Sequence, residues 1–148
     1  MSDWAKTRRV RGRIVLTAAD PLVGDLHLQP LGAPGHPMES PLEMLNRPEP
    51  FFAVSVDDGV QLVAKAAVVA VSLDSAASED HPFAHPGELE VLMDDGQEYR
   101  GAIDIELPPP ARRPLDFLNQ PEPFFALRAG DRCWYLARGH VVRARPLD

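Results

Sequence analysis

A long internal repeat constrains this chain more than any other feature of its sequence. The segment PLEMLNRPEPFFAV at 41–54 recurs as PLDFLNQPEPFFAL at 114–127, and the match continues without a gap. Between 41–72 and 114–145, a constant offset of 73 positions, 14 of 32 residues are identical. A match of this length indicates a duplication, and two copies are too few for a solenoid.

The repeat also divides the chain. Upstream, LVGDLHL at 22–28 aligns with YRGAIDI at 99–105 at an offset of 77, so the first copy is four residues longer in between. The segment DSAASEDHPFAHP is polar and contains proline, which is typical of a linker. We therefore predict a basic N-terminal tail over 1–7, a first unit over 8–73, a linker over 74–86 and a second unit over 87–148.

A unit of about 65 residues buries too little surface to be comfortably stable alone. We expect the two units to pack on each other about a pseudo-twofold axis. The alternative is that each unit pairs with a second chain.

Short strands with sharp turns dominate each unit. GRIVLTAAD and LVGDLHL are typical of two strands, and in the second unit ELEVLM and EYRGAIDIEL flank DDGQ, an Asp-Gly hairpin signal. Gly24 and Gly101 occupy matched positions inside the second strand. A glycine inside a strand marks a bulge, a bend or a close backbone approach.

A short helix follows in each unit. Ser40, Pro41 and Glu43 predict a capping box with proline in the first turn. We expect the helices to end at Asn46 and Asn119, residues that tolerate the left-handed conformation. The leucines expected to face the core are Leu42, Leu45, Leu115 and Leu118.

Three further strands complete each unit: FFAVSV, VQLVAKA and VVAVSL, matched by FFALRA, CWYLARG and VVRARPL. A lone basic residue should face water, so alternation from Arg138 places Leu136 and Trp134 on the outer face. Cys133, Tyr135 and Ala137 would then point inwards. The candidate interaction surface is Trp134, Leu136, Arg138, Arg143 and Arg145.

An outward tryptophan beside a leucine and an arginine is typical of an interface hot spot. The alternative is that the other unit covers this face, which would make Trp134 part of the core between the units.

These elements predict a mainly β fold of two tandem duplicated small β-barrels, each of about five strands and one short helix, of the SH3-like or Sm-like kind. The endings LVAKAAVVAVSL and YLARGHVVRARPL resemble the last two strands of Sm-like proteins, with Arg138-Gly139 matching their basic-glycine step. That resemblance implies RNA contacts at Asp116 and Asn119. The whole pattern also resembles functionally unassigned bacterial β-modules, which bring no known activity.

Charge and composition narrow the function classes. The net charge is −7, and residues 14–111 alone carry −14, which opposes a general nucleic-acid binder. The single cysteine, Cys133, excludes an internal disulfide and any multi-cysteine zinc site. No apolar run approaches the ~20 residues of a membrane span. Arginine far outnumbers lysine, as in a GC-rich bacterial genome, so we expect a cytoplasmic bacterial protein.

The residues that could carry chemistry are better explained as structure. The spacing of His81 and His85 suits zinc only on a helix, and prolines make that segment a loop. The remaining candidates are interpreted as turn, connector or core residues: His140, Cys133, Glu49, Glu122, Asp57, Asp58, Asp94 and Asp95. We therefore expect no catalytic residue, no metal and no cofactor.

The preferred prediction is a non-catalytic protein–protein interaction or scaffold module, whose partner is another protein, a second copy of itself, or both. The alternative is an RNA- or ligand-binding regulator that uses the basic C-terminal face. A continuous basic face with exposed aromatic residues would favour nucleic acid. An exposed apolar patch would favour a protein partner.

Overall fold

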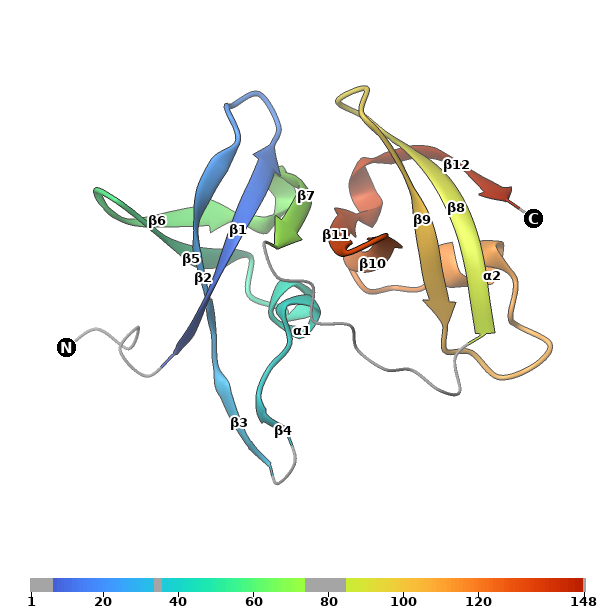
Figure 1. Cartoon of the computed structure of the whole chain (residues 1–148), viewed down its shortest axis with the longest axis horizontal. Coiled ribbons are helices and arrows are strands. Elements are labelled where there is room, and N and C mark those ends of the chain that lie inside the picture. The colour runs from blue at the N-terminus through green and yellow to red at the C-terminus, as the bar shows by residue number, and fades with distance from the viewer. Residues whose placement is uncertain (1–6, 34–35, 74–84, 148) are drawn as a thin grey trace.

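The computed structural model shows a mainly β protein and describes residues 7–33, 36–73 and 85–147 (Figure 1). Ten antiparallel strands form one open sheet in the order β12-β8-β9-β10-β11-β7-β1-β2-β5-β6. The first unit contributes β1 (Arg8–Leu16), β2 (Leu22–Leu28), β5 (Phe51–Val56), β6 (Gly59–Ala64) and β7 (Val68–Leu73). The second unit contributes β8 (His85–Met93), β9 (Glu98–Ile105), β10 (Phe124–Ala129), β11 (Arg132–Ala137) and β12 (Val141–Leu147).

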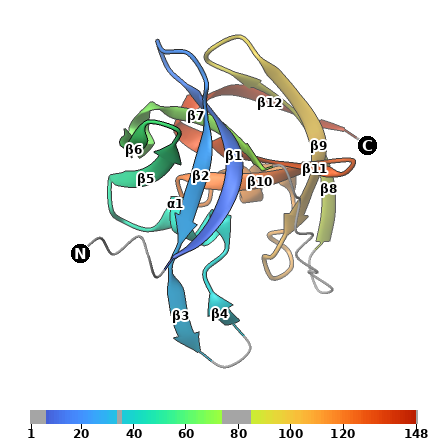
Figure 2. The ribbon, with the colours of Figure 1, turned by 60° about the vertical axis from the view of Figure 1, so that its left-hand side comes forward.

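Each unit also has one short helix, and each has a single 3-10 turn before its last strand. The helices are α1 (Pro41–Asn46) and α2 (Pro114–Leu118), and the turns are Lys65–Ala67 and Arg138–His140. A separate two-stranded ladder, β3 (Pro30–Ala33) with β4 (His36–Met38), was not predicted and has no counterpart in the second unit. It projects from the sheet in Figure 2, in the part of the first unit that is longer by four residues.

The same strand pairings recur in the two units. The first unit has the order β7-β1-β2-β5-β6 and the second β12-β8-β9-β10-β11, so in both cases the fifth strand lies beside the first. The registers repeat at the sequence offset: Phe51 pairs with Ala64, and Phe124 pairs with Ala137. A residue of one unit therefore has a defined counterpart in the other.

The two units are joined edge to edge by β11 and β7. Trp134 pairs with Ser72, Tyr135 with Val71 and Leu136 with Ala70. Here the fourth strand of one unit meets the fifth strand of the other. The expected pseudo-twofold axis is therefore wrong, because a twofold axis would bring identical surfaces together. The ladder continues across both units as one open sheet rather than closing on itself within either.

Local sequence signals account for several of these elements. Glu43 N–H donates to Ser40 Oγ at 3.1 Å and Ser40 N–H donates to Glu43 Oε1 at 3.2 Å, which confirms the capping box. A Cβ atom on Gly24 or Gly101 would collide with a carbonyl oxygen of the next strand, so both glycines permit a close backbone approach.

The helix ends differ from the prediction. The residue after α1, Arg47, is extended, and Asn119 has a φ of −82°, so neither helix ends in a left-handed asparagine. Of the four leucines expected in the core, Leu115 is exposed.

Two apolar clusters fill the molecule, and both cross the boundary between the units. The first-unit core takes in side chains of β10 and β11, namely Phe124, Cys133, Tyr135 and Ala137. The second-unit core takes in Val69 and Ala70 of β7. As a result, all six residues of β7 are buried.

The ends of the predicted linker and tail lie partly beyond the described residues. β8 begins at His85, inside the segment predicted as the linker 74–86, whose first eleven residues are outside the described ranges. The predicted tail 1–7 is described only at Thr7. In the described part of the chain, no helix has the length and apolarity needed to cross a membrane.

Candidate interaction surface

The predicted orientation of β11 is wrong. Leu136 is fully buried in the second-unit core, and Trp134 is half-buried, with its ring 4.9 Å from that of Tyr99 in an edge-on contact. The opposite side chains, Cys133 and Tyr135, are also buried, against the first unit. Both faces of β11 are therefore covered, and Trp134 and Leu136 do not form an exposed patch.

Arg138 also has a structural role. Its guanidinium donates to the carbonyl oxygens of Phe117, Leu118, Glu122 and Phe124 at 2.7–3.2 Å, so it closes the C-terminal end of α2. Burial lowers the pKa of Arg138, and the charge of Glu122 opposes this shift. The expectation that this lone basic residue faces water is therefore wrong.

Lys65, the counterpart of Arg138, does the same for α1. Its Nζ donates to the carbonyl oxygens of Met44 and Arg47, both at 2.9 Å. Burial and the charge of Arg47 lower the pKa of Lys65. The unusual basic residue in each repeat thus replaces the missing hydrogen-bond donors at a helix end.

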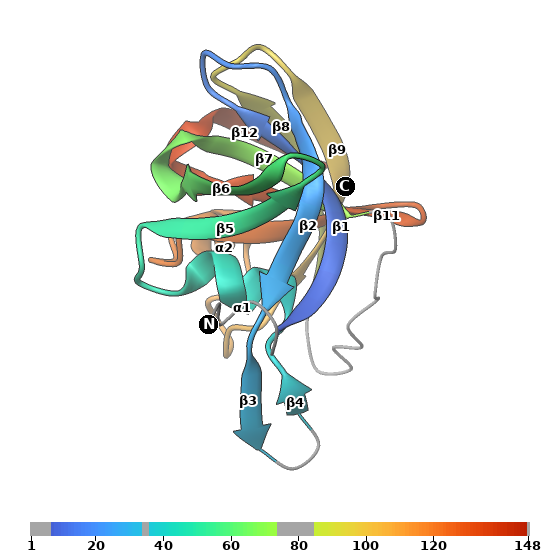
Figure 3. The ribbon, with the colours of Figure 1, turned by 90° about the vertical axis from the view of Figure 1, so that its left-hand side faces the viewer.

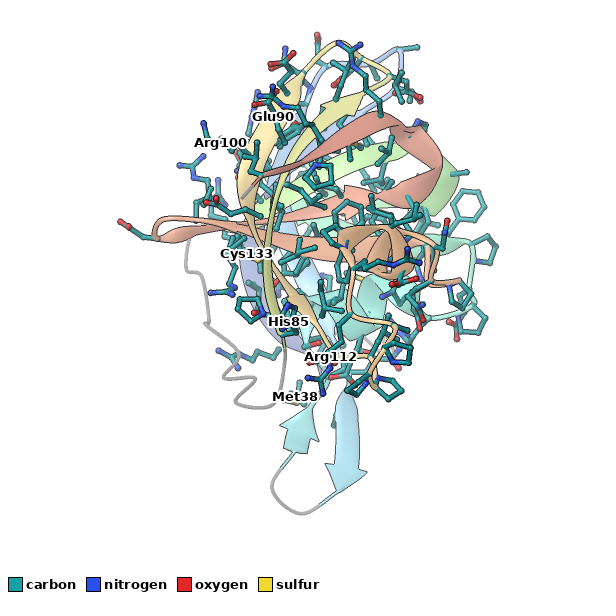
Figure 4. All side chains as sticks on the ribbon, turned by 90° about the vertical axis from the view of Figure 1, so that its right-hand side faces the viewer. Met38, His85, Glu90, Arg100, Arg112 and Cys133 are labelled. Carbon is teal, nitrogen blue, oxygen red and sulfur yellow. The ribbon has the colours of Figure 1, made fainter. Side chains whose placement is uncertain are left out.

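Arg143 and Arg145 are exposed on β12, but they are not part of a continuous basic face. Arg145 Nη2 lies 3.1 Å from Glu90 Oε2, and the hollow beside these arginines is also lined by Glu98. Figure 4 shows Glu90 near Arg100 at one end of this face, and Arg112 lies far away at the other.

The residues implied by the Sm-like resemblance do not form a ready RNA contact. The carboxylate of Asp116 accepts hydrogen bonds from the main chain and guanidinium of Arg113, which lower the pKa of Asp116. Asn119 is exposed, and within the described residues its side-chain amide has no hydrogen-bond partner.

The counterpart of Asn119 has a defined task at the junction of the units. Asn46 Nδ2 donates to the carbonyl oxygen of Phe124 at 3.2 Å, and Phe124 N–H donates to Asn46 Oδ1 at 2.8 Å. The amide thereby holds the start of β10 against α1. A groove of about 590 Å³ opens beside this contact, between α1, α2 and the β10–β11 hairpin.

His140 makes a second link between the units. Its Nε2 lies 2.8 Å from the carbonyl oxygen of Ala66, and its Nδ1 lies 2.6 Å from Asp94 Oδ2. Burial lowers the pKa of His140, but these two hydrogen bonds and the charges of Asp94 and Asp95 outweigh it and raise the pKa above its ordinary value. A protonated His140 therefore strengthens this link.

The first exposed apolar patch lies at the β6 end of the sheet. Phe51, Val60 and Leu62 have exposed fractions of 57%, 44% and 68%. They lie on β5 and β6, which face the viewer in Figure 3 with no other strand in front of them. We call these three residues the β6 patch.

Two further exposed apolar residues lie on the elements around β8, at the β12 end of the sheet. Leu115 on α2 and Val142 on β12 have exposed fractions of 57% and 61%. Figures 1 and 2 both place β6 and β12 on opposite sides of the molecule. We call Leu115 and Val142 the β12 patch.

The remaining candidates for chemistry lie apart from one another. Cys133 is buried, His85 is exposed on β8, and His81 lies outside the described residues. Glu49 and Glu122 are exposed. Among the described residues, no three His, Cys, Asp or Glu side chains form a group that could hold a metal ion.

The sequence analysis missed the residues of both patches, although a signal existed. The strand RCWYLA is apolar on both of its faces, which is typical of a strand buried on both sides. Its counterpart GVQLVA keeps the apolar residues Val60 and Leu62 at the positions of Cys133 and Tyr135. A comparison of the two copies therefore indicates that this face of β6 is built to be covered.

Comparison of the chain with family models, with curated proteins and with solved structures finds no match in any of the three.

Proposed function

We propose that this protein is a non-catalytic interaction or scaffold module of a bacterial cytoplasm, built from two tandem duplicated units of the SH3-like or Sm-like kind. One observation carries the proposal. Of the six large apolar residues that are exposed in the described structure, three form the β6 patch on the paired strands β5 and β6, and two more are Leu115 on α2 and Val142 on β12. Scattered apolar residues need no explanation, but apolar residues gathered at sheet edges mark protein interaction sites.

The RNA-binding alternative has less support. Among the described residues, the exposed large aromatic side chain is Phe51. It lies at the β6 end, where the segment 48–64 carries three acidic residues and no basic residue. The arginines of β12 share a hollow with Glu90 of β8 and Glu98 of β9, and Arg145 is paired with Glu90. Binding of single-stranded nucleic acid needs aromatic and basic side chains on one surface.

The experiment is quantitative capture from an extract of the native cell, with and without nuclease. The tagged protein is compared with Leu62→Lys, which changes the β6 patch, and with Val23→Lys, a matched control. Val23 is the sixth exposed apolar residue and lies in neither patch.

We expect the captured proteins to resist nuclease, to be lost with Leu62→Lys and to be kept with Val23→Lys. The proposal is contradicted if the captured proteins are lost after nuclease treatment, or if they are retained by Leu62→Lys.

A further inference from the structure

We propose that the chain binds a second copy of itself head to tail, with β6 of one copy extending the sheet beside β12 of the next. This inference rests on the proposed interaction function and identifies its partner. The two free edges of the ten-stranded sheet are β12 and β6. Their counterparts in the other unit, β7 and β11, already pair with each other inside the chain.

The internal junction predicts the register of the contact between copies. Each residue at the junction has a counterpart 73 positions away in the other unit. The internal pairs are Trp134–Ser72, Tyr135–Val71 and Leu136–Ala70. Replacing each residue by its counterpart gives Gln61–Arg145, Leu62–Ala144 and Val63–Arg143 as the pairs between copies. Pro146 lacks an N–H but lies just beyond this ladder of three pairs, as its counterpart Leu73 does at the internal junction.

Burial shows that the β6 patch is the unoccupied copy of an interface that the chain itself contains. The counterparts of Phe51, Val60 and Leu62 are Phe124, Cys133 and Tyr135, whose exposed fractions are 2%, 6% and 6%. These three side chains belong to the second unit but pack into the core of the first. The β6 patch therefore has the composition and position of a surface that packs into a neighbouring unit.

At the internal junction, β7 and α1 of the first unit form the side that receives β10 and β11. The β12 patch corresponds to this receiving side and has nothing packed on it in the described structure. The counterpart of Val142 is Val69, which is fully buried in the second-unit core across the junction. The counterpart of Leu115 is Leu42, which packs against the core shared with β10 and β11. Each exposed patch thus lacks the partner that its counterpart has.

The hydrogen-bonding groups at the internal junction also have exposed counterparts at the two ends of the sheet. Asn46 on the receiving side binds the N–H and carbonyl oxygen of Phe124. The shifted pair is Asn119 and Phe51, which are both exposed. In the assembly, the amide of Asn119 binds the main chain of Phe51 in the next copy.

Charge supports a second copy as the occupant. The segment 48–64, which contains β5 and β6, carries Glu49, Asp57 and Asp58 and no basic residue. On β12, Arg145 is already paired with Glu90 of β8 at 3.1 Å, so Arg143 is the arginine that can meet this acidic segment. Complementary charge favours the head-to-tail contact over a contact between two identical ends.

When two copies join head to tail, the β12 edge of one copy and the β6 edge of the other remain unpaired. Further copies can therefore add until the assembly closes into a ring, or it grows as an open filament. Every complex then contains an even number of units, with junctions inside chains alternating with junctions between chains.

The test uses the purified full-length chain and measures mass by light scattering and native mass spectrometry. We expect the wild type to form complexes of several copies. Leu62→Lys disables the β6 end and Val142→Asp disables the β12 end, and each should be a monomer. Because both residues are exposed, the folded monomer should remain, which the melting temperature checks. Val23→Lys should assemble like the wild type.

The decisive step is to mix the two monomeric variants. Leu62→Lys retains a working β12 end and Val142→Asp retains a working β6 end, so the mixture should give a dimer with one copy of each. A contact between identical ends would be broken by only one of the two variants.

The inference is overturned if the wild type is monomeric at the highest soluble concentration, if only one variant dissociates, or if the mixture stays monomeric. A monomeric wild type that still loses its captured proteins through Leu62→Lys would remove self-association but leave the proposed interaction function standing.

Discussion

The amide of Asn46 provides the sharpest test of how the two units are held together. In Asn46→Ala, Phe124 N–H loses its acceptor at 2.8 Å, while the Phe124 carbonyl oxygen keeps the Arg138 donor at 3.2 Å. Phe124 is 2% exposed, so water does not readily replace the amide. An orphaned buried donor costs about 1–3 kcal/mol and a lost neutral hydrogen bond about 1 kcal/mol. We expect the free energy of unfolding to fall by about 2–3 kcal/mol.

Urea unfolding at low protein concentration measures this loss. With a slope of about 1–3 kcal/mol per molar urea, the midpoint should move down by about 0.7–3 M while the slope stays unchanged. Asn119→Ala is the matched control, because the same residue in the second unit has no side-chain hydrogen bond within the described residues. Its free energy of unfolding should stay within about 0.5 kcal/mol of the wild type. Equal losses for the two variants, or no loss for Asn46→Ala, would refute the assigned role.

Three further predictions follow from the strands and turns around this junction. Gly101→Ala should destabilise the protein by about 1–3 kcal/mol in urea unfolding, because its Cβ would meet the carbonyl oxygen of Arg128, whereas Gly139→Ala, which has open space, should change little. Lys65→Met should cost about 1–3 kcal/mol by the same measurement, because the carbonyl oxygen of Arg47 loses the Lys65 donor and that of Met44 keeps only the N–H of Arg47 at 3.3 Å. The pKa of His140 is raised in the folded state, so the stability gained by the wild type over His140→Gln should be full below about pH 6.5 and disappear as the pH rises through the raised pKa. Melting curves at several pH values check this sign, and a difference that grows with pH would contradict it.

Local signals in the sequence were sufficient for the parts of the fold that depend on a few neighbouring residues. The capping box at Ser40 and the Asp-Gly hairpin at Gly96 were predicted, because each is determined within one turn. For Gly101 the sequence left a bulge, a bend and a close backbone approach open, and the structure shows the close approach. The orientation of Leu136 was not, because alternation identifies the inner face only when the other face is in water.

The junction between the units depends on contacts that no local pattern contains. The pairing of β11 with β7 joins residues far apart in the chain, and it is decided by which edges remain free after each unit has formed. The exposure of Leu62 and the burial of its counterpart Tyr135 have the same cause, because one strand lies at an end of the sheet and the other in its middle. The predicted outward orientation of Leu136 was therefore wrong, although the strand registers of the two units follow the repeat alignment.

The position of β7 has a consequence for the growing chain on the ribosome. When the first unit leaves the ribosome, one edge of β7 and the apolar side of α1 are still uncovered. The strands that cover them, β10 and β11, are synthesised late, just before β12. Until the β10–β11 hairpin emerges, the edge of β7 that β11 will cover is exposed to other chains, including finished copies of the protein. Slow translation between 74 and 137 therefore lengthens the period in which this edge of β7 is open to pairing with another chain.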